Sequence, residues 1–412
     1  MSKLKPKILH VYFSHSASGY RPGWARFDIL TEMFRRKGYE AWILGYKMKW
    51  SSLKQKLFGG IEIDKNSKVI NLIIPHWLST IDVFLNNLFL IGGFGWSILL
   101  ALISNRIKPN TIILTDDTIG TNFYFLLIKK ILQKKINIII DYQDLTAQMH
   151  TCKSKNIFKK LISQTIDEVI NPRLAKKLIV ISKFGKDYLM QRSNVKDIYV
   201  IPAIAESKNL DNYSKEECRR LFNIPLNYKV IIWSGFIEGF TTKDVLFLID
   251  AISLCKHKNE IMLVMIGGGI EYDRYYILNH AKRKGVNAMH LGYFDSNKAE
   301  YWLCLRSADI GIFMRPNALF SHFLNGAKVA DYISVGLPVI VPCLKGQLDT
   351  LEYKAICYIP EDKYDLSKKI DLALEMDLEK YSLEMEELSR KIFNEVRKLF
   401  EDENFISFLL KS

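Results

Sequence analysis

The sequence has few of the features that mark disulfide-rich or metal-binding proteins. Its 412 residues include six cysteines. No two of them form a CxxC pair, and none stands near a histidine at the spacing of metal ligands. Several lie in apolar stretches such as YWLCLRSADI, residues 301–310. This pattern predicts reduced, buried thiols, and neither a disulfide framework nor a zinc site.

Long uninterrupted apolar runs are scarce as well. The apolar run after the first basic residues is too short for a signal peptide and has no cleavage site, so we expect it to form a first strand. Residues 83–103 approach the length of a membrane-spanning helix. Asn86, Asn87 and three glycines interrupt them. We expect a buried helix of a soluble domain here, and a membrane-dipping segment is the alternative.

The sequence also lacks repeats and low-complexity tracts, and its bulk composition is that of a globular protein. About half of the residues (49%) are hydrophobic and 25% are charged. The length favours two domains of about 200 residues each. A net charge of +14 indicates an anionic partner: nucleic acid, an acidic membrane surface or a phosphate-bearing small molecule. Nucleic acid is disfavoured because no recognised binding motif accompanies the charge.

Short apolar runs alternate with segments of helical periodicity along most of the chain. In the first half, strands are expected at residues 7–13, 40–46, 68–74, 111–115, 136–141 and 178–182. Between the first two, GWARFDILTEMFRRKGYE (residues 23–40) carries one apolar stripe and has Gly38 placed to end a helix. A strand, a helix and a strand in about forty residues form a βαβ unit, which implies a parallel sheet covered on both faces.

The pattern loosens near residues 202–215 and then restarts. Further strands are expected in YKVIIWSG, EIMLVMIGGG, ADIGIFM and LPVIVP, which begin at residues 228, 260, 308 and 337. We therefore predict an α/β protein with two Rossmann-like, doubly wound domains, residues 1–202 and 203–380. Residues 381–412 form a charged helical segment whose apolar side chains need a surface to cover, and the first domain is one candidate.

Ligands of open parallel sheets bind beyond the carboxyl ends of the strands. In the first domain this rule selects Gly19, Tyr20, Arg21, Asp116, Asp117, Asp141 and Asp144. The four carboxylates are candidates for orienting acceptor or sugar hydroxyls, although such strand-end aspartates are more often turn residues. In the second domain it selects Gly235 and Gly268, which allow a ligand close to the backbone. Neither stands in a full GxGxxG or phosphate-loop motif.

The segment NGAKVADYISVGLPVIV, residues 325–341, is the most informative. Asn325 and Gly326 precede an expected helix, whose first N–H groups together with Lys328 would form a cradle for a diphosphate. Asp331 lies about one turn further along and could accept hydrogen bonds from ribose hydroxyls. In the alternative reading, Lys328 and Asp331 form a solvated i,i+3 pair.

This segment resembles the KLFEYLAAGKPVVAT-type segment of retaining glycosyltransferases of family 4. The blocks IIWSGFIEGFTTKDVLFLIDAI, LVMIGGGIEYDRYYIL and MHLGYFDSNKAEYWLCLRSADIGIFM, which begin at residues 231, 263 and 289, are similar to theirs and occur in the same order. In the first half, the opening glycine loop and helix and the stretch from residue 176 to 202 are similar as well. The resemblance spans about residues 5–370 and rests on the order of the blocks.

The resemblance implies the GT-B fold, with two Rossmann-like domains that face each other across a cleft. It places the donor nucleotide on the second domain and the acceptor mainly on the first, with Gly19, Tyr20, Arg21, Asp141 and Asp144 as acceptor-side candidates. Asp331 matches the carboxylate that binds the nucleotide ribose. Lys328 matches a lysine of one branch of the family, and Lys243 is near the lysine on the donor phosphates.

Catalysis would then consist mainly of stabilising charge on the departing diphosphate. Lys243 and Lys328 are expected to supply it, with Asp116 and Asp117 orienting hydroxyls. In the family, the donor phosphate is thought to take the acceptor proton, so no protein base is required. We expect a UDP-sugar donor in preference to a GDP-sugar, and no cofactor or metal.

The sequence departs from the family pattern at several of these positions. Phe323 stands where the first of two glutamates is common, and Phe236 and Ile237 stand where a basic residue is common. Two alternatives to an active transferase stay open, and these departures motivate the first. One is a non-catalytic GT-B partner subunit that keeps the fold, and the other is a nucleotide-sugar epimerase, which needs no separate acceptor.

Two basic stretches in the first domain, residues 47–58 and 153–160, would suit an anionic membrane surface or a lipid-linked diphosphate acceptor. An ordinary lysine-rich surface is the alternative. We expect a cytoplasmic protein, with the inner face of the membrane as a candidate location. The predicted function is sugar transfer to a glycan or lipid-linked acceptor in bacterial cell-surface polysaccharide or glycoconjugate synthesis.

Overall fold

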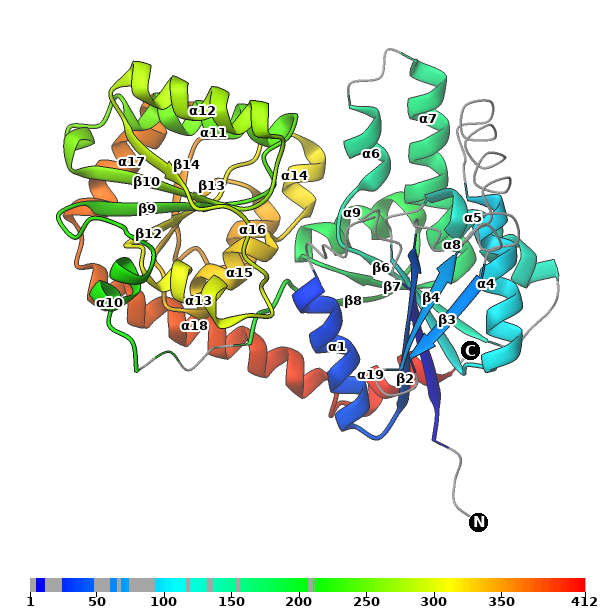
Figure 1. Cartoon of the computed structure of the whole chain (residues 1–412). Helices are drawn as coiled ribbons and strands as arrows, with labels where there is room; N and C mark the ends of the chain where they lie inside the picture. Colours follow the sequence, from blue (N-terminus) through cyan, green and yellow to red (C-terminus); the bar gives the residue numbers. More distant parts are fainter. Residues whose placement is uncertain are drawn as a thin grey trace. The chain divides into compact units, whose positions relative to one another are not determined.

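The chain forms two compact units, Met1–Pro202 with Val396–Ser412 and Ala203–Glu395 (Figure 1). The computed structural model describes residues 5–11, 24–47, 60–64, 68–73, 93–115, 119–131, 136–152, 156–206, 210 and 212–411. Within these ranges, no helix is both long enough and apolar enough to cross a membrane. Of residues 83–103, the described part begins at Gly93 and belongs to a helix of 14 residues, Phe94–Ile107.

The first unit is built on an eight-stranded sheet in the order β3-β4-β2-β1-β5-β6-β7-β8. The strands are β1 (Lys7–Val11), β2 (Glu40–Lys47), β3 (Gly60–Asp64), β4 (Val69–Ile73), β5 (Thr111–Thr115), β6 (Asn137–Tyr142), β7 (Lys177–Val180) and β8 (Asp197–Val200). All neighbours pair in parallel except β3 with β4. Every residue of β5 and β6 is buried, as expected for strands covered on both faces.

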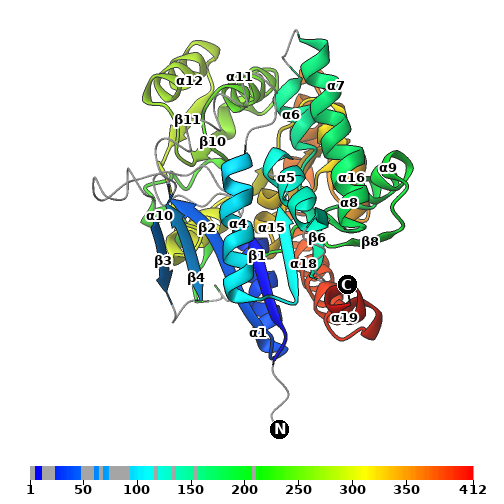
Figure 2. The same cartoon turned by 90° about the vertical axis from the view of Figure 1, so that its right-hand side faces the viewer.

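The helices of the first unit follow these strands. They are α1 (Trp24–Arg36), α4 (Phe94–Ile107), α5 (Ile119–Ile131), α6 (Thr146–Thr151), α7 (Ile157–Thr165), the π-helix η1 (Ile166–Ile170), α8 (Asn171–Ala175), α9 (Lys183–Ser193) and α19 (Glu403–Leu410). Figure 2 looks onto the side that carries α4, α5 and α7, and α4 packs against α5 there. The chain runs from α7 through η1 into α8 without a break.

The C-terminal helix α19 completes the core of the first unit. Phe405 and Leu409 are fully buried, and Phe405 packs against Tyr199 of β8 with ring centroids 4.9 Å apart. Asn137 at the start of β6 donates to the carbonyl oxygen of Leu409 at 2.7 Å. Helix α19 therefore packs against strands of the sheet of the first unit, although it lies far from them in sequence.

The second unit has a six-stranded, fully parallel sheet in the order β11-β10-β9-β12-β13-β14. The strands are β9 (Lys229–Ser234), β10 (Ile261–Ile266), β11 (Asn287–His290), β12 (Ile310–Ile312), β13 (Val339–Pro342) and β14 (Ile356–Tyr358). The helices are α10 (Lys215–Leu221), α11 (Phe240–Ile252), the 3-10 helix η2 (Lys258–Glu260), α12 (Glu271–Lys284), α13 (Ala299–Arg306), α14 (Leu319–Phe323), α15 (Ala327–Ser334), α16 (Lys345–Thr350), α17 (Lys363–Glu375) and α18 (Leu378–Leu399), of which the part up to Glu395 belongs to this unit.

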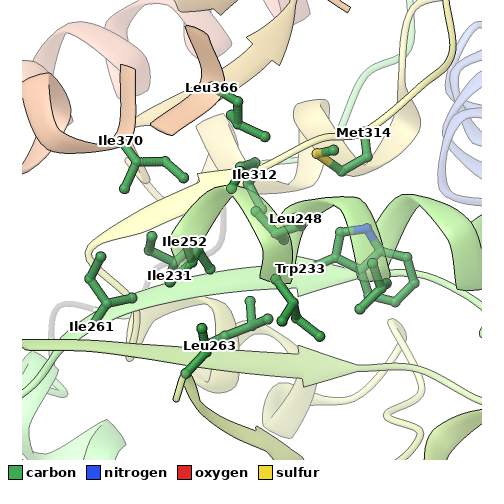
Figure 3. Close-up of a cluster of buried hydrophobic side chains, with 14 of the residues drawn as sticks. Ile231, Trp233, Leu248, Ile252, Ile261, Leu263, Ile312, Met314, Leu366 and Ile370 are labelled. Atoms are coloured by element: carbon green, nitrogen blue, oxygen red, sulfur yellow. The ribbon is translucent and has the colours of Figure 1, made fainter. Parts of the chain in front are cut away.

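The core of the second unit fixes α11 and α17 on its sheet (Figure 3). Ile231 and Leu263 from the strands meet Leu248 of α11 and Leu366 of α17, and all four are fully buried. Burial of a side chain of this size contributes about 1.5–3 kcal/mol. Because α11 begins soon after β9 ends, its first turn lies near the carboxyl end of that strand.

One cysteine prediction was wrong. Cys343 and Cys357 form a disulfide with a Cα–Cα distance of 5.1 Å, whereas we expected only reduced thiols. The two residues are 14 positions apart in sequence. They meet because β13 and β14 are parallel neighbours in which Pro342 pairs with Tyr358. Of the other four cysteines, Cys152 is exposed, and Cys218, Cys255 and Cys304 are buried thiols.

Candidate functional site

The strand order of the second unit changes direction at β9. The chain runs from β9 through α11 to β10 on one side, whereas β12 lies on the other side of β9. In open α/β sheets such a switch point opens a crevice beyond the carboxyl ends of the strands, and ligands bind there. The segments that follow β9, β10, β12 and β13 are therefore the expected lining of a ligand site.

The loops after β9 and β10 continue the pairing of their strands. The N–H of Gly235 donates to the Ile266 carbonyl oxygen at 3.0 Å, and that of Ile237 donates to Gly268 at 2.9 Å. The Ile270 N–H then donates back to the Ile237 carbonyl oxygen at 3.1 Å. The backbone of both loops is thus held in a fixed form.

This close pairing explains the glycines. Gly267 has a φ of 136°, and a Cβ there would lie 1.7 Å from the carbonyl oxygen of Gly235. A Cβ on Gly235 would meet the Trp233 ring at 2.6 Å, and one on Gly268 would meet the Phe236 ring at 3.0 Å. Internal packing therefore requires glycine at Gly267 and favours it at Gly235 and Gly268. The donor-binding role of Gly235 and Gly268 stays a prediction.

The N-terminus of α15 presents unused backbone donors. The N–H of Gly326 donates to Gln347 Oε1 at 2.8 Å, whereas the N–H groups of Ala327 and Lys328 find no acceptor among the residues that the structure describes. A Cβ on Gly326 would lie 2.7 Å from the Phe313 ring, so the approach of the helix to β12 requires glycine. Free N–H groups at a helix N-terminus favour an anion.

Three buried polar side chains, in α14, just before α15 and in α16, have an atom without a partner in the described part of the chain. They are Ser321 Oγ, Asn325 Nδ2 and Gln347 Nε2. All three residues are at most 3% exposed. A buried polar group without a partner costs about 1–3 kcal/mol, so such a cluster is expected where a ligand supplies the partners. Two amide donors beside two free N–H groups match a ligand rich in acceptor oxygens.

Lys328 and Asp331 form an ion pair in which the Asp331 carboxylate is buried. Asp331 is 4% exposed, and its Oδ2 accepts hydrogen bonds from the Tyr301 hydroxyl at 2.7 Å and from Lys328 Nζ at 3.4 Å. The ammonium also lies 5.1 Å from the centroid of the Tyr301 ring. Burial, and then the nearby Asp331 carboxylate, raise the pKa of Tyr301 well above its usual value, so its hydroxyl stays a donor. The pair therefore differs from the solvated one that we considered.

Two further cations lie at the switch point. Lys243, in the first turn of α11, is exposed and makes no ion pair with the described residues. Arg315 follows β12, and its Nε is buried without a partner in the described chain. Its guanidinium carbon lies 5.7 Å from the centroid of the Phe313 ring. Sequence reasoning missed Arg315, although a basic residue just after a buried strand was a usable signal.

Asp244 is the carboxylate next to these cations in sequence. Burial raises its pKa to about 6, while the charge of Arg315 opposes this rise and that of Glu361 adds to it. Among the described residues, no ion pair within 4.0 Å joins Asp244 to Arg315. The positive charge of Arg315 is thus not neutralised by a direct ion pair with Asp244.

The first-unit candidates fall into two groups. Gly19, Tyr20, Arg21, Asp116 and Asp117 lie outside the described residues. Asp141 and Asp144 lie at the end of β6, the first buried and the second half-buried. Their acceptor-binding roles stay predictions.

The Asp141 carboxylate is occupied by a buried arginine. Arg26 Nη1 lies 2.5 Å from Asp141 Oδ2, and Nη2 lies 3.0 Å from Oδ1. Nη2 also donates to the carbonyl oxygen of Ile201 at 3.0 Å. This bidentate pair ties α1 to β6 and to the end of the first unit. Direct contact between Asp141 and an acceptor would require Arg26 to move.

Phe323, which stands where the family that the sequence resembles commonly has a glutamate, is fully buried and presents no polar group. Among the described residues, no group of three or more His, Cys, Asp or Glu side chains is placed to hold a metal ion.

A scan against models of protein families finds no match for this sequence, and a search of curated proteins finds none either. Comparison with solved structures gives matches over nearly the whole chain. A sucrose-phosphate synthase from Thermosynechococcus elongatus matches with a TM-score of 0.70 and 14% identity, covering 98% of this chain and 99% of that one.

Two further matches cover both units. A UDP-forming α,α-trehalose-phosphate synthase from Burkholderia xenovorans has a TM-score of 0.67 and 12% identity, over 98% of this chain and 99% of that one. HepE from Anabaena, in complex with UDP and glucose, has a TM-score of 0.64 and 13% identity, over 96% of this chain and 99% of that one. The chain therefore has the GT-B fold, in which one polypeptide forms two Rossmann-like α/β units.

Proposed function

We propose that this protein is a glycosyltransferase that takes a sugar from a nucleoside-diphosphate sugar, with the donor on the second unit. The observation that carries the proposal is the set of unpartnered donors at the N-terminus of α15: the N–H groups of Ala327 and Lys328 and the buried amides of Asn325 and Gln347. A diphosphate supplies the acceptor oxygens and the negative charge that these groups lack.

In this proposal the diphosphate is the departing group, and its developing charge is stabilised by cations fixed in advance. Lys328 is held by Asp331 and Tyr301 beside the helix end. Lys243 and Arg315 supply positive charge from α11 and from the end of β12. Arg315 thereby replaces the basic residue that the family commonly has where this chain has Phe236 and Ile237.

Asp331 is proposed to mark the ribose position. Its carboxylate is kept in place by the Tyr301 hydroxyl, at the helix turn that follows the diphosphate cradle. UDP is the proposed nucleotide, in preference to GDP. HepE was solved with UDP and glucose, and the Burkholderia enzyme is described as UDP-forming.

Retention of configuration, as in family 4, is the proposed stereochemistry. The donor phosphate would take the acceptor proton, so that no protein base takes part. Asp116 and Asp117 remain the candidates for orienting hydroxyls, and Gly19, Tyr20, Arg21, Asp141 and Asp144 remain the acceptor-side candidates. The proposed acceptor is a glycan or lipid-linked sugar of a bacterial cell-surface polysaccharide or glycoconjugate, reached at the inner face of the membrane.

Donor binding is tested by the shift in melting temperature that UDP, GDP and their sugar conjugates produce. We expect UDP to stabilise the unmodified protein, and Lys328→Ala and Asn325→Ala to weaken UDP binding about tenfold or more, because each removes a donor to a charged group. Lys368→Ala, at an exposed position of α17, is the matched control. If no nucleoside diphosphate shifts the melting temperature, the donor site is not where we place it.

Turnover separates the remaining possibilities. Release of UDP that depends on an added acceptor supports a transferase. Sugar interconversion without an acceptor would indicate an epimerase. Binding of UDP-sugar without either reaction would indicate a non-catalytic subunit.

A further inference from the structure

Helix α7 of the first unit turns its apolar side chains away from the protein. Ile157 and Phe158 are 70% and 78% exposed, and Leu161 and Ile162 are 56% and 41% exposed. Ser163, a polar residue, is buried on the opposite side at 6%. A helix on the surface of a globular protein normally shows the reverse arrangement, with its apolar stripe facing the core.

The four apolar side chains form one continuous face. At 3.6 residues per turn, positions 157, 158, 161 and 162 lie within about 140° of arc, and Ser163 lies across the helix from their centre. We call these four residues the α7 apolar face. A contiguous exposed patch of this kind marks an interaction site.

The helix does not need this face in order to stay folded. Asn156 caps its first turn by accepting a hydrogen bond from the Lys159 N–H at 3.0 Å. Its C-terminal end runs directly into η1, where Ile166, Asp167 and Glu168 are buried. Neighbouring α6 packs beside it (Figure 1). The apolar face is therefore presented on a helix that is anchored elsewhere.

The charged residues that flank the face in sequence all have one sign. Lys159 and Lys160 lie on the same helix, outside the apolar arc. Lys153 and Lys155 precede it in sequence, and residues 151–166 contain no Asp or Glu. The whole chain carries a net charge of +14. An apolar stripe bordered by lysines is complementary to a surface with an apolar interior and an anionic outer layer.

We propose that α7 binds the interface of an anionic lipid bilayer, with the α7 apolar face among the upper acyl chains and Lys160 at the headgroup phosphates. Nine residues rise only about 14 Å in a helix, so α7 lies in the interface and does not span the bilayer. The inference does not depend on the proposed function, because it requires neither donor nor acceptor.

Vesicle flotation with the full-length protein tests it, without nucleotide or sugar. We expect the protein to float with vesicles of phosphatidylcholine and phosphatidylglycerol and to float more weakly with phosphatidylcholine alone. The double variant Phe158→Ser/Leu161→Ser should bind at least about tenfold more weakly, because it removes two apolar contacts with the acyl chains. Lys160→Gln should bind about fivefold more weakly. Leu383→Ser, at a 65% exposed position of α18, is the matched control and should bind like the unmodified protein.

A second variant gives an independent readout. Phe158→Trp keeps the face apolar, and its added tryptophan emission should shift to shorter wavelength when anionic vesicles are added. The proposal is overturned if the unmodified protein does not float, if the double variant floats equally well, or if the tryptophan emission does not move. It is also overturned if, without vesicles, size exclusion shows a dimer that the double variant converts to a monomer, because a second copy would then occupy the face.

Discussion

Asp167 is a buried carboxyl group in the first turn of the π-helix η1. Its Oδ2 accepts a hydrogen bond from the Ala147 N–H at 3.0 Å, and the residue is 1% exposed. Burial raises its pKa to about 7, and the adjacent Glu168 adds to the rise, although the Ala147 hydrogen bond opposes it. In the unfolded chain the same group has an ordinary pKa of 3.8.

This difference predicts a stability that falls as the pH rises. Between pH 3.8 and about 7 the folded protein holds a proton on Asp167 that the unfolded chain has released, so the free energy of unfolding decreases across this window. The full effect is on the order of 4 kcal/mol. Asp167→Asn keeps the acceptor oxygen and removes the titration. We expect the variant to be more stable than the unmodified protein at about pH 8 and similar to it near pH 4.

Urea denaturation followed by circular dichroism at these two pH values measures the effect. The buried His10 contributes a slope of opposite sign, because burial and then the charge of Arg26 lower its pKa. That slope is the same in both proteins and cancels in the comparison. Asp187→Asn, at an exposed position of α9, is the control. Parallel pH profiles for Asp167→Asn and the unmodified protein would contradict the prediction.

The candidate site shows which residues a sequence can reveal. Asn325, Gly326, Lys328 and Asp331 could be predicted to act together because they stand within seven residues of one another at the start of a helix. Tyr301 and Gln347 join them from other elements. No local pattern brings a hydroxyl from α13 to within 2.7 Å of Asp331, since that contact depends on how α13 and α15 pack.

At the scale of elements, the inner strands of both sheets could be predicted from their apolar runs. Four strands were missed: β3, β8, β11 and β14. β3, β8, β11 and β14 are the edge strands of their sheets. An edge strand has a neighbour on one side only, so fewer of its side chains are buried and its sequence shows a weaker apolar pattern. The disulfide was missed for the same reason, because it depends on the pairing of β14 with β13.

The pairing of the loops after β9 and β10 predicts how glycine substitutions there change the stability of the second unit. Gly267→Ala places a Cβ 1.7 Å from the Gly235 carbonyl oxygen in a backbone with φ 136°, so the two loops must separate. We expect a loss of at least about 3 kcal/mol in the free energy of unfolding. Gly285→Ala, which also has a positive φ (66°) but nothing within 4 Å of its Cβ, should cost only about 1 kcal/mol. Chemical denaturation compares the two, and equal losses would show that the loop contact does not stabilise the unit.

At the scale of the whole molecule, the path of the chain determines how the core of the first unit is completed. The polypeptide leaves the first unit at Pro202, builds the second as Ala203–Glu395, and returns to the first at Val396. The returning segment brings Phe400 against Phe34 of α1, with ring centroids 5.1 Å apart, and Phe405 against Phe400 at 5.3 Å. The core of the first unit is therefore completed only when the last residues are in place.

This dependence predicts that a change in the tail weakens the first unit and spares the second. Phe405→Ala removes a fully buried ring and should lower the stability of the first unit by about 3–5 kcal/mol. Leu383→Ala, on a 65% exposed side chain, should change stability by less than about 0.5 kcal/mol. Hydrogen exchange resolves the two units: amides of β5 and β6 should exchange faster in Phe405→Ala, and those of β9 and β10 should keep their protection because the second unit has its own core. Equal acceleration in both sheets would mean that the units unfold together, and unchanged exchange in β6 would mean that α19 contributes little to the first unit.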